Sequence, residues 1–373
     1  MHNHLFVFMW MNDPKMATAA FSFLFFPTSV TIIITICTIT RATNLPKFSS
    51  ILAFGDSTVD TGNNNYLQTF FRGNHSPYGQ DFPDHIPTGR FSNGKLIPDI
   101  VASLLHIKET VPPFLDPSLS NEDLLTGVTF ASAGSGYDDL TAAESRVISM
   151  SDQLELFRNY ISRLKGIVGE VEANYIIDNA LVIVSAGTND FVYNYYDSPT
   201  RRLQFNISTY QDFLLSNLHN FIKELCNLGG RSMVIVGLPP IGCLPLQITA
   251  RYKESMQRNC LKDENSDSQA YNIKLQKLLS EMQAVAPESQ IAYANVFDPL
   301  VDMITHPQKF GFVETSRGCC GSGFVEAGSL CNAATPTCGM AAQFLFWDSI
   351  HPSEAAYKSL SHSLQKQLIP TSS

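Results

Sequence analysis

Four continuous runs of apolar residues, separated by helical patterns, most constrain how this 373-residue chain can fold. The runs are residues 51–54, 180–186, 232–236 and 290–294. An apolar run without alternation is typical of a strand that is buried on both faces, as in a parallel sheet. We expect one further strand within residues 123–136, where a β-rich middle leads into small residues and a tight turn.

Amphipathic helical patterns fill the intervals between these runs. After Ser151, for example, apolar residues recur at steps of three and four up to Val168. Other helices are predicted over residues 96–105, from Ser208, over residues 270–285 and from Pro352. Strands that alternate with helices indicate a parallel sheet covered on both faces. We therefore predict an α/β protein, a three-layer α/β/α sandwich with a mostly parallel sheet, in a single domain spanning residues 43–373.

The first 42 residues are expected to lie outside this fold, as an N-terminal extension and signal peptide. No charged residue occurs from Met16 to Thr40, Lys15 precedes this stretch, and Thr40 and Ala42 are small residues in the positions that signal cleavage requires. An uncleaved anchor helix is the alternative, since roughly 20 apolar residues can span a bilayer. The sequence leaves open whether translation starts at Met1 or Met16.

Cysteine usage agrees with export to an oxidising compartment. Six cysteines are disulfide candidates, with their pairing left open: Cys243, Cys260, Cys319, Cys320, Cys331 and Cys338. Cys226 lies in a predicted helix and is the candidate for the odd thiol. A zinc cluster is the alternative, but the adjacent Cys319 and Cys320 and the lack of a C-x-x-C pair argue against it. Asn74 and Asn206 begin sequons and are candidate glycan acceptors.

The net charge of −9 and the isoelectric point near 5.4 argue against nucleic acid or an anionic membrane surface as a main partner. We expect no stable membrane insertion once the signal is removed. The sequence predicts neither a cofactor nor a bound metal.

Polar residues stand where several predicted strands end. The first strand runs into Gly55-Asp56-Ser57, and the carboxyl edge of an open α/β sheet is where ligands bind. A serine hydroxyl at that edge becomes a nucleophile only if a general base and oxyanion donors converge on it. Ser57 is therefore the candidate nucleophile.

The candidate base lies just before the last predicted helix, in Asp348-Ser-Ile-His351-Pro352. A hydrolytic serine needs an imidazole to take its proton, and a carboxylate to orient that imidazole. Asp348 and His351, three residues apart on one loop, can form this pair. A surface or helix-capping role is the alternative for any single histidine.

An oxyanion needs donors placed where negative charge develops. The backbone N–H groups of Ser57 and Gly134 and the side-chain amide of Asn189 form the natural set. The alternative is that Gly134 is only a turn glycine and Asn189 only a cap.

Two motifs are misleading. Residues 89–95 nearly spell a phosphate-binding loop, but Leu96 replaces the required hydroxyl residue. Asp60-Thr-Gly62 matches an aspartic-protease triplet that needs a second copy, and the chain has none. The G-x-S-x-G elbow of ordinary α/β-hydrolases is also absent.

Together these residues resemble the SGNH hydrolases. The four matching blocks are Phe54-Gly-Asp-Ser57, Gly134, Gly187-x-Asn189-Asp190 and Asp348-x-x-His351. More narrowly, the chain resembles plant GDSL esterase/lipases from about residue 48 to 369. Further segments carry that likeness: Thr88-Gly-Arg-Phe-Ser-Asn-Gly94, Gly237-Leu-Pro-Pro-Ile-Gly-Cys243, Gly318-Cys-Cys-Gly321 and Phe346-Trp-Asp348.

The resemblance implies a flavodoxin-like SGNH hydrolase fold with Ser57 as nucleophile, His351 as base and Asp348 as its orienting group. It implies an oxyanion hole made by Ser57, Gly134 and Asn189. It also implies a secreted, extracellular carboxylester hydrolase of the apoplast or cell wall, acting on a small-molecule, lipid or cell-wall ester. Thr58 and Thr129 depart from residues common in the family, and neither touches the expected chemistry.

Two other functions fit the same residues. An acyltransferase would pass the acyl group to a sugar or alcohol instead of water, and a secreted binding protein would carry an inactive site. The sequence leaves open the acyl and alcohol parts of the substrate, the biological process and the oligomeric state.

Overall fold

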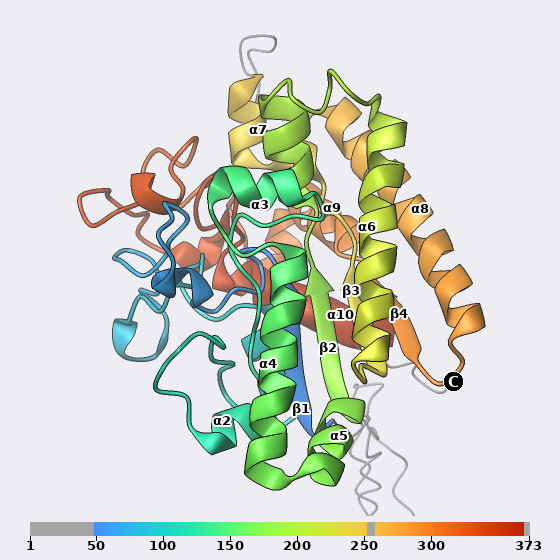
Figure 1. Ribbon diagram of the computed structural model, residues 1–373. Coiled ribbons are helices and arrows are strands. Elements are labelled where there is room, and N and C mark those ends of the chain that lie inside the picture. Colours follow the sequence, from blue (N-terminus) through green and yellow to red (C-terminus); the bar gives the residue numbers. More distant parts are fainter. Residues whose placement is uncertain (1–47, 252–257, 369–373) are drawn as a thin grey trace, which may run out of the picture. The chain divides into compact units, whose positions relative to one another are not determined.

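The computed structural model describes residues 48–251 and 258–368 (Figure 1). The predicted extension and signal, residues 1–42, lie outside the described residues. Within the described ranges, no helix combines the length and the apolar character needed to cross a bilayer.

The central sheet has four parallel strands in the order in which they occur along the chain. They are β1 (Ser50–Gly55), β2 (Ala180–Ser185), β3 (Ser232–Val236) and β4 (Gln290–Ala294). All four predicted runs are therefore confirmed as strands of a parallel sheet. The prediction of full burial is wrong for β4, which forms an edge of this sheet and whose first four residues are partly or fully exposed, and in β3 only Ser232 is partly exposed.

The further strand predicted within residues 123–136 is only partly correct. Its first residues belong to helix α2 (Asn121–Thr126), which Ser120 caps by accepting a hydrogen bond from the Asp123 amide at 3.1 Å. Residues 128–132 then run beside β1, and the amides of Phe130 and Ser132 donate to the carbonyls of Ala53 and Gly55. If this extended segment is counted as the second strand, the spatial order is 2-1-3-4-5, which is the flavodoxin-like order.

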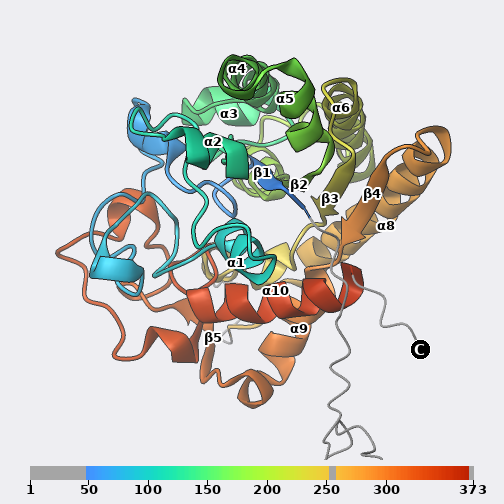
Figure 2. The same cartoon turned by 90° about the horizontal axis from the view of Figure 1, so that it is seen from below.

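Helices cover both faces of the sheet (Figure 2). One face carries α4 (Met150–Val168), α5 (Glu170–Asp178) and α6 (Ile207–Asn227), and the other carries α1 (Ile97–Leu104) and α10 (Glu354–Leu368). Helix α8 (Lys262–Val285) packs against β4 and α6. The predicted three-layer α/β/α sandwich is thus confirmed.

The shorter elements were not predicted from the sequence. They are α3 (Asp139–Ser145), α7 (Pro245–Ala250), α9 (Phe297–Thr305), a π-helical segment η3 (Asp190–Asp197), and a second, two-stranded sheet of β5 (Glu314–Gly318) and β6 (Phe344–Phe346).

Three long helices begin earlier than expected: α8 begins at Lys262 instead of residue 270, and α4 and α6 begin slightly earlier because residues further upstream cap them. Ser149 caps α4 by accepting from the Asp152 amide at 3.1 Å, and Asn206 caps α6 by accepting from the Thr209 amide at 3.0 Å. Side-chain oxygens of Ser and Asn at this position satisfy amides that have no partner within the helix.

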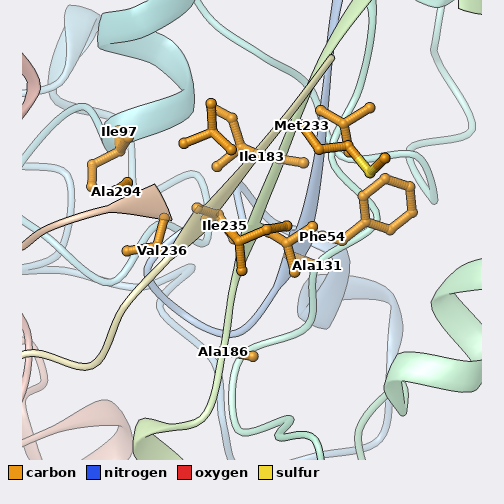
Figure 3. Close-up of a cluster of buried hydrophobic side chains, with 14 of the residues drawn as sticks. Phe54, Ile97, Ala131, Ile183, Ala186, Met233, Ile235, Val236 and Ala294 are labelled. Atoms are coloured by element: carbon orange, nitrogen blue, oxygen red, sulfur yellow. The ribbon is translucent and has the colours of Figure 1, made fainter. Parts of the chain in front are cut away.

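The core is built around the apolar strands (Figure 3). Phe54 of β1, Ile183 of β2 and Ile235 of β3 are buried there with the side chains of their neighbours. The Phe54 ring stacks on Phe130 at a centroid distance of 4.8 Å and meets Phe157 of α4 edge-on at 5.4 Å. This packing fixes the end of β1, from which Ser57 projects.

Candidate active site

The chain turns sharply at the carboxyl end of β1. Gly55 has a φ of +137°, and a Cβ added there would lie 1.8 Å from the carbonyl oxygen of Ser185 on β2. Only glycine permits this close approach of two backbones. The next residue, Asp56, accepts hydrogen bonds from the amide and the hydroxyl of Thr58 at 3.0 and 2.8 Å. Its burial raises the pKa of Asp56 to about 6, and Ser57 stands at the tip of the turn.

Asp348 and His351 follow β6 on one tight loop. The Asp348 carboxylate shapes this loop by accepting the backbone N–H groups of Ile350 and His351 at 2.9 and 2.7 Å. The same carboxylate lies 2.8–2.9 Å from Nδ1 of the His351 ring. A three-residue spacing thus brings an acid and an imidazole together without a further element.

The imidazole also reaches Ser57. Nε2 of His351 lies 2.8 Å from Oγ of Ser57, although the two residues are 294 positions apart in the sequence. With Nδ1 donating to Asp348, Nε2 is the acceptor for the serine hydroxyl. A hydroxyl, a base and an orienting carboxylate in one hydrogen-bonded line is the arrangement that activates a serine nucleophile.

The residues predicted as oxyanion donors lie around the same strand ends. Asn189 follows β2, and its Nδ2 donates to the carbonyl of Ser135 at 2.8 Å, which leaves its second N–H available. The loop that contains Gly134 is anchored to β1, because the Ser135 hydroxyl donates to the carbonyl of Gly55 at 2.7 Å. Among the described residues, no acceptor takes the backbone N–H of Ser57 or of Gly134.

A narrow cavity of about 70 Å³ opens beside Ser57, Asn189 and His351. Apolar side chains from β3, α9 and α10 form much of its wall, among them Val236, Leu300 and Leu360. Three of the predicted site residues, Ser57, Asn189 and His351, line this cavity, and Gly134 is not among the lining residues. Apolar walls with a few convergent polar groups are typical of sites for small organic ligands.

The two misleading motifs have structural roles. Asp60 accepts the backbone amides of Gly62, Asn63 and Ala133, which ties the turn after β1 to the loop before Gly134. In the segment that resembles a phosphate-binding loop, the ring of Phe91 lies 4.8 Å from the ring of His351.

One residue of the site was missed by the sequence reasoning. The hydroxyl of Tyr78 donates to Oδ2 of Asp348 at 2.6 Å. Tyr78 lies in a long loop rich in proline and asparagine, 270 residues before Asp348, and no spacing or motif indicated its role.

The six candidate cysteines form three disulfides: Cys243–Cys260, Cys319–Cys338 and Cys320–Cys331. Cys226 is a free thiol, half-buried at the end of α6. The two candidate glycan acceptors, Asn74 and Asn206, are both exposed.

Comparisons with known proteins show the family to which a chain with this fold belongs. The sequence model for the GDSL-like lipase/acylhydrolase family matches residues 51–364. The chain therefore belongs to the GDSL-like lipase/acylhydrolase family.

Similar curated proteins come from Arabidopsis thaliana. GDSL esterase/lipase At2g24560 is 55% identical over 88% of this chain and 91% of its own length. GDSL esterase/lipase At2g31550 is 56% identical over 87% and 90% of the two chains, and GDSL esterase/lipase At1g06990 is 49% identical over 98% of each. Because the family and these relatives are esterases or lipases, the chain is a carboxylester hydrolase.

Proposed function

We propose that this protein is a secreted serine esterase that works through a Ser57–His351–Asp348 triad and a covalent acyl-enzyme. The observation that carries the proposal is the 2.8 Å contact between Ser57 Oγ and His351 Nε2, with Asp348 against the other ring nitrogen.

The reaction has two halves. Ser57 Oγ attacks the ester carbonyl while His351 Nε2 takes the hydroxyl proton, and the tetrahedral intermediate then expels the alcohol, which receives that proton. In the second half, His351 takes a proton from water as the water oxygen attacks the acyl-enzyme. The acid is released, and Ser57 regains its proton from His351. Asp348 holds the ring and stabilises the imidazolium in both halves.

Negative charge develops on the carbonyl oxygen in each half. The proposed donors to it are the backbone N–H of Ser57 and the amide of Asn189, two residues that line the cavity, with the backbone N–H of Gly134 as a third donor from outside the lining. Neither backbone N–H is taken by an acceptor among the described residues. Donors that are held in place before the reaction stabilise the transition state more than water molecules do, because they need no reorganisation.

The mainly apolar cavity favours an ester with an aliphatic portion. Export fits the uncharged stretch at residues 16–40 and the three disulfides, which persist in oxidising compartments. The exposed Asn206 is the preferred glycan acceptor, with Asn74 as a second candidate.

The test is hydrolysis of p-nitrophenyl acetate and p-nitrophenyl octanoate by protein collected from the medium of expressing plant cells. Ser57→Ala should lose nearly all turnover, whereas Ser280→Ala, an exposed serine on α8, should keep it. Equal rates in Ser57→Ala and the wild type would contradict the proposal. Acyl esters of an added alcohol as the main product would instead favour acyl transfer.

A further inference from the structure

The Asp348 carboxylate is buried and is held by hydrogen bonds alone. Oδ1 accepts two backbone amides, and Oδ2 accepts from Tyr78 as well as facing the His351 ring. No lysine or arginine pairs with it among the described residues. A buried carboxylate without a cationic partner depends on such donors to remain charged.

Tyr78 is fixed so that its hydroxyl faces this carboxylate. The residue is 1% exposed, and its ring lies 5.5 Å from that of Phe91 and 6.2 Å from that of Trp347, measured between centroids. Burial and the neighbouring Asp348 raise the pKa of Tyr78 well above its ordinary value, so the hydroxyl keeps its proton.

The tyrosine oxygen also accepts a hydrogen bond. The backbone N–H of Gly328 donates to it at 2.8 Å, and Gly328 lies in the loop closed by the Cys320–Cys331 disulfide. Donation to the oxygen makes its own O–H a stronger donor to Asp348. In Figures 1 and 2, the loop that follows β1 and the loop before α10 lie on the same side of the sheet.

The disulfide loop also flanks the Asp348 segment directly. The amide of Cys320 donates to the carbonyl of Trp347 at 2.9 Å, and the amide of Ser349 donates to the carbonyl of Glu326 at 2.9 Å. Asp348 therefore lies between two bonds to this loop, and Tyr78 provides a third link through its side chain.

We propose that Tyr78 is a positioning residue for the triad. The Cys320–Cys331 loop holds Tyr78 in place, and Tyr78 in turn sets the orientation and the effective charge of Asp348. The inference rests on the proposed function of Ser57, His351 and Asp348. Tyr78 touches neither Ser57 nor His351 through any hydrogen bond among the described residues, so it acts through Asp348.

Other titratable groups surround the triad. Asp56, Tyr193 and Tyr357 interact electrostatically with the Asp348–His351 pair, and the ring of His75 lies 5.4 Å from that of Tyr78. None of them donates a hydrogen bond to Asp348 among the described residues. The Tyr78 hydroxyl is therefore the group whose removal changes that carboxylate directly.

Tyr78→Phe removes only the hydroxyl. Without this donor, the negative charge of the Asp348 carboxylate is less stabilised by hydrogen bonds. The carboxylate then attracts the imidazolium form of His351 more strongly, and the neutral imidazole that acts as base forms only at higher pH. We expect the acid limb of the kcat/KM profile for p-nitrophenyl acetate to move to higher pH. A movement of about one pH unit lowers kcat/KM about tenfold on the acid side.

Tyr160→Phe is the matched control, because Tyr160 is equally buried and donates to the carbonyl of Leu124, away from the site. An unchanged pH profile in Tyr78→Phe would overturn the inference. So would an equal loss of activity in both variants without movement of the acid limb, since that would indicate a structural role only. Ser57→Ala, measured in parallel, separates the two hypotheses: an active Ser57→Ala contradicts the proposed function itself.

Discussion

At the scale of single residues, Asn189 carries the most testable part of the proposed oxyanion hole. Asn189 is 7% exposed and lines the cavity beside Ser57, and its side-chain amide is held by its bond to the Ser135 carbonyl. A preorganised side-chain donor of this kind stabilises the transition state more than the bound substrate.

Asn189→Ala should therefore lower kcat for p-nitrophenyl acetate by a factor of about 10²–10³, with a much smaller change in KM. Steady-state kinetics of the purified variant provides the measurement. Asn227→Ala, an exposed asparagine near the end of α6, is the control. Full turnover in Asn189→Ala would show that the oxyanion is bound elsewhere.

At this scale, the sequence could indicate which residues lie together only where a short spacing or a strand end placed them. Asp348 and His351 are three residues apart, and Ser57 directly follows an apolar run, so both could be placed at one sheet edge. Tyr78 could not be found in this way, because its contact with Asp348 depends on how a long loop folds over the sheet.

At the scale of elements, helix α9 contributes apolar side chains to the wall of the cavity. Leu300 of α9 is buried and lines the cavity, and Ile304, one turn further along the same helix, lines it as well. If the aliphatic part of the ester occupies this cavity, its length is limited by these side chains.

Leu300→Trp should fill part of the cavity and shift selectivity toward short esters. We expect the ratio of kcat/KM for p-nitrophenyl octanoate to that for p-nitrophenyl acetate to fall about tenfold. The loss of a methylene contact in an apolar pocket changes the selectivity between two substrates by about this factor. Val301→Trp is the control, because Val301 is on the same helix, partly exposed, and does not line the cavity. An equal ratio in both variants would place the aliphatic part elsewhere.

The elements themselves were predictable to different degrees. The long helices α4, α6 and α10 carry several turns of apolar periodicity, and the strands β1 to β4 are unbroken apolar runs. Helix α9 has only nine residues, and residues 128–132 follow a capped helical turn, so tertiary contacts rather than local pattern decide their conformation.

At the scale of the whole molecule, the site is assembled from both ends of the described chain. β1 delivers Ser57, the β2 end delivers Asn189, and the loop after β6 delivers Asp348 and His351. The flavodoxin-like order explains the meeting point, since connections leave β1 toward opposite sides of the sheet and open a crevice at the carboxyl edge. Parallel topology thus explains how residues 294 positions apart come within 2.8 Å.

The central claim is that this assembly makes Ser57 a nucleophile activated by His351. The most direct test is covalent labelling with a fluorophosphonate, in which Ser57 Oγ displaces fluoride and forms a stable bond to phosphorus. Wild-type protein and His351→Ala are incubated with the reagent, digested, and mapped by mass spectrometry over time. We predict a single adduct on the peptide that contains Ser57, formed at least about 10²-fold more slowly in His351→Ala. An adduct on a different residue, or an equal labelling rate in the two proteins, would contradict the account.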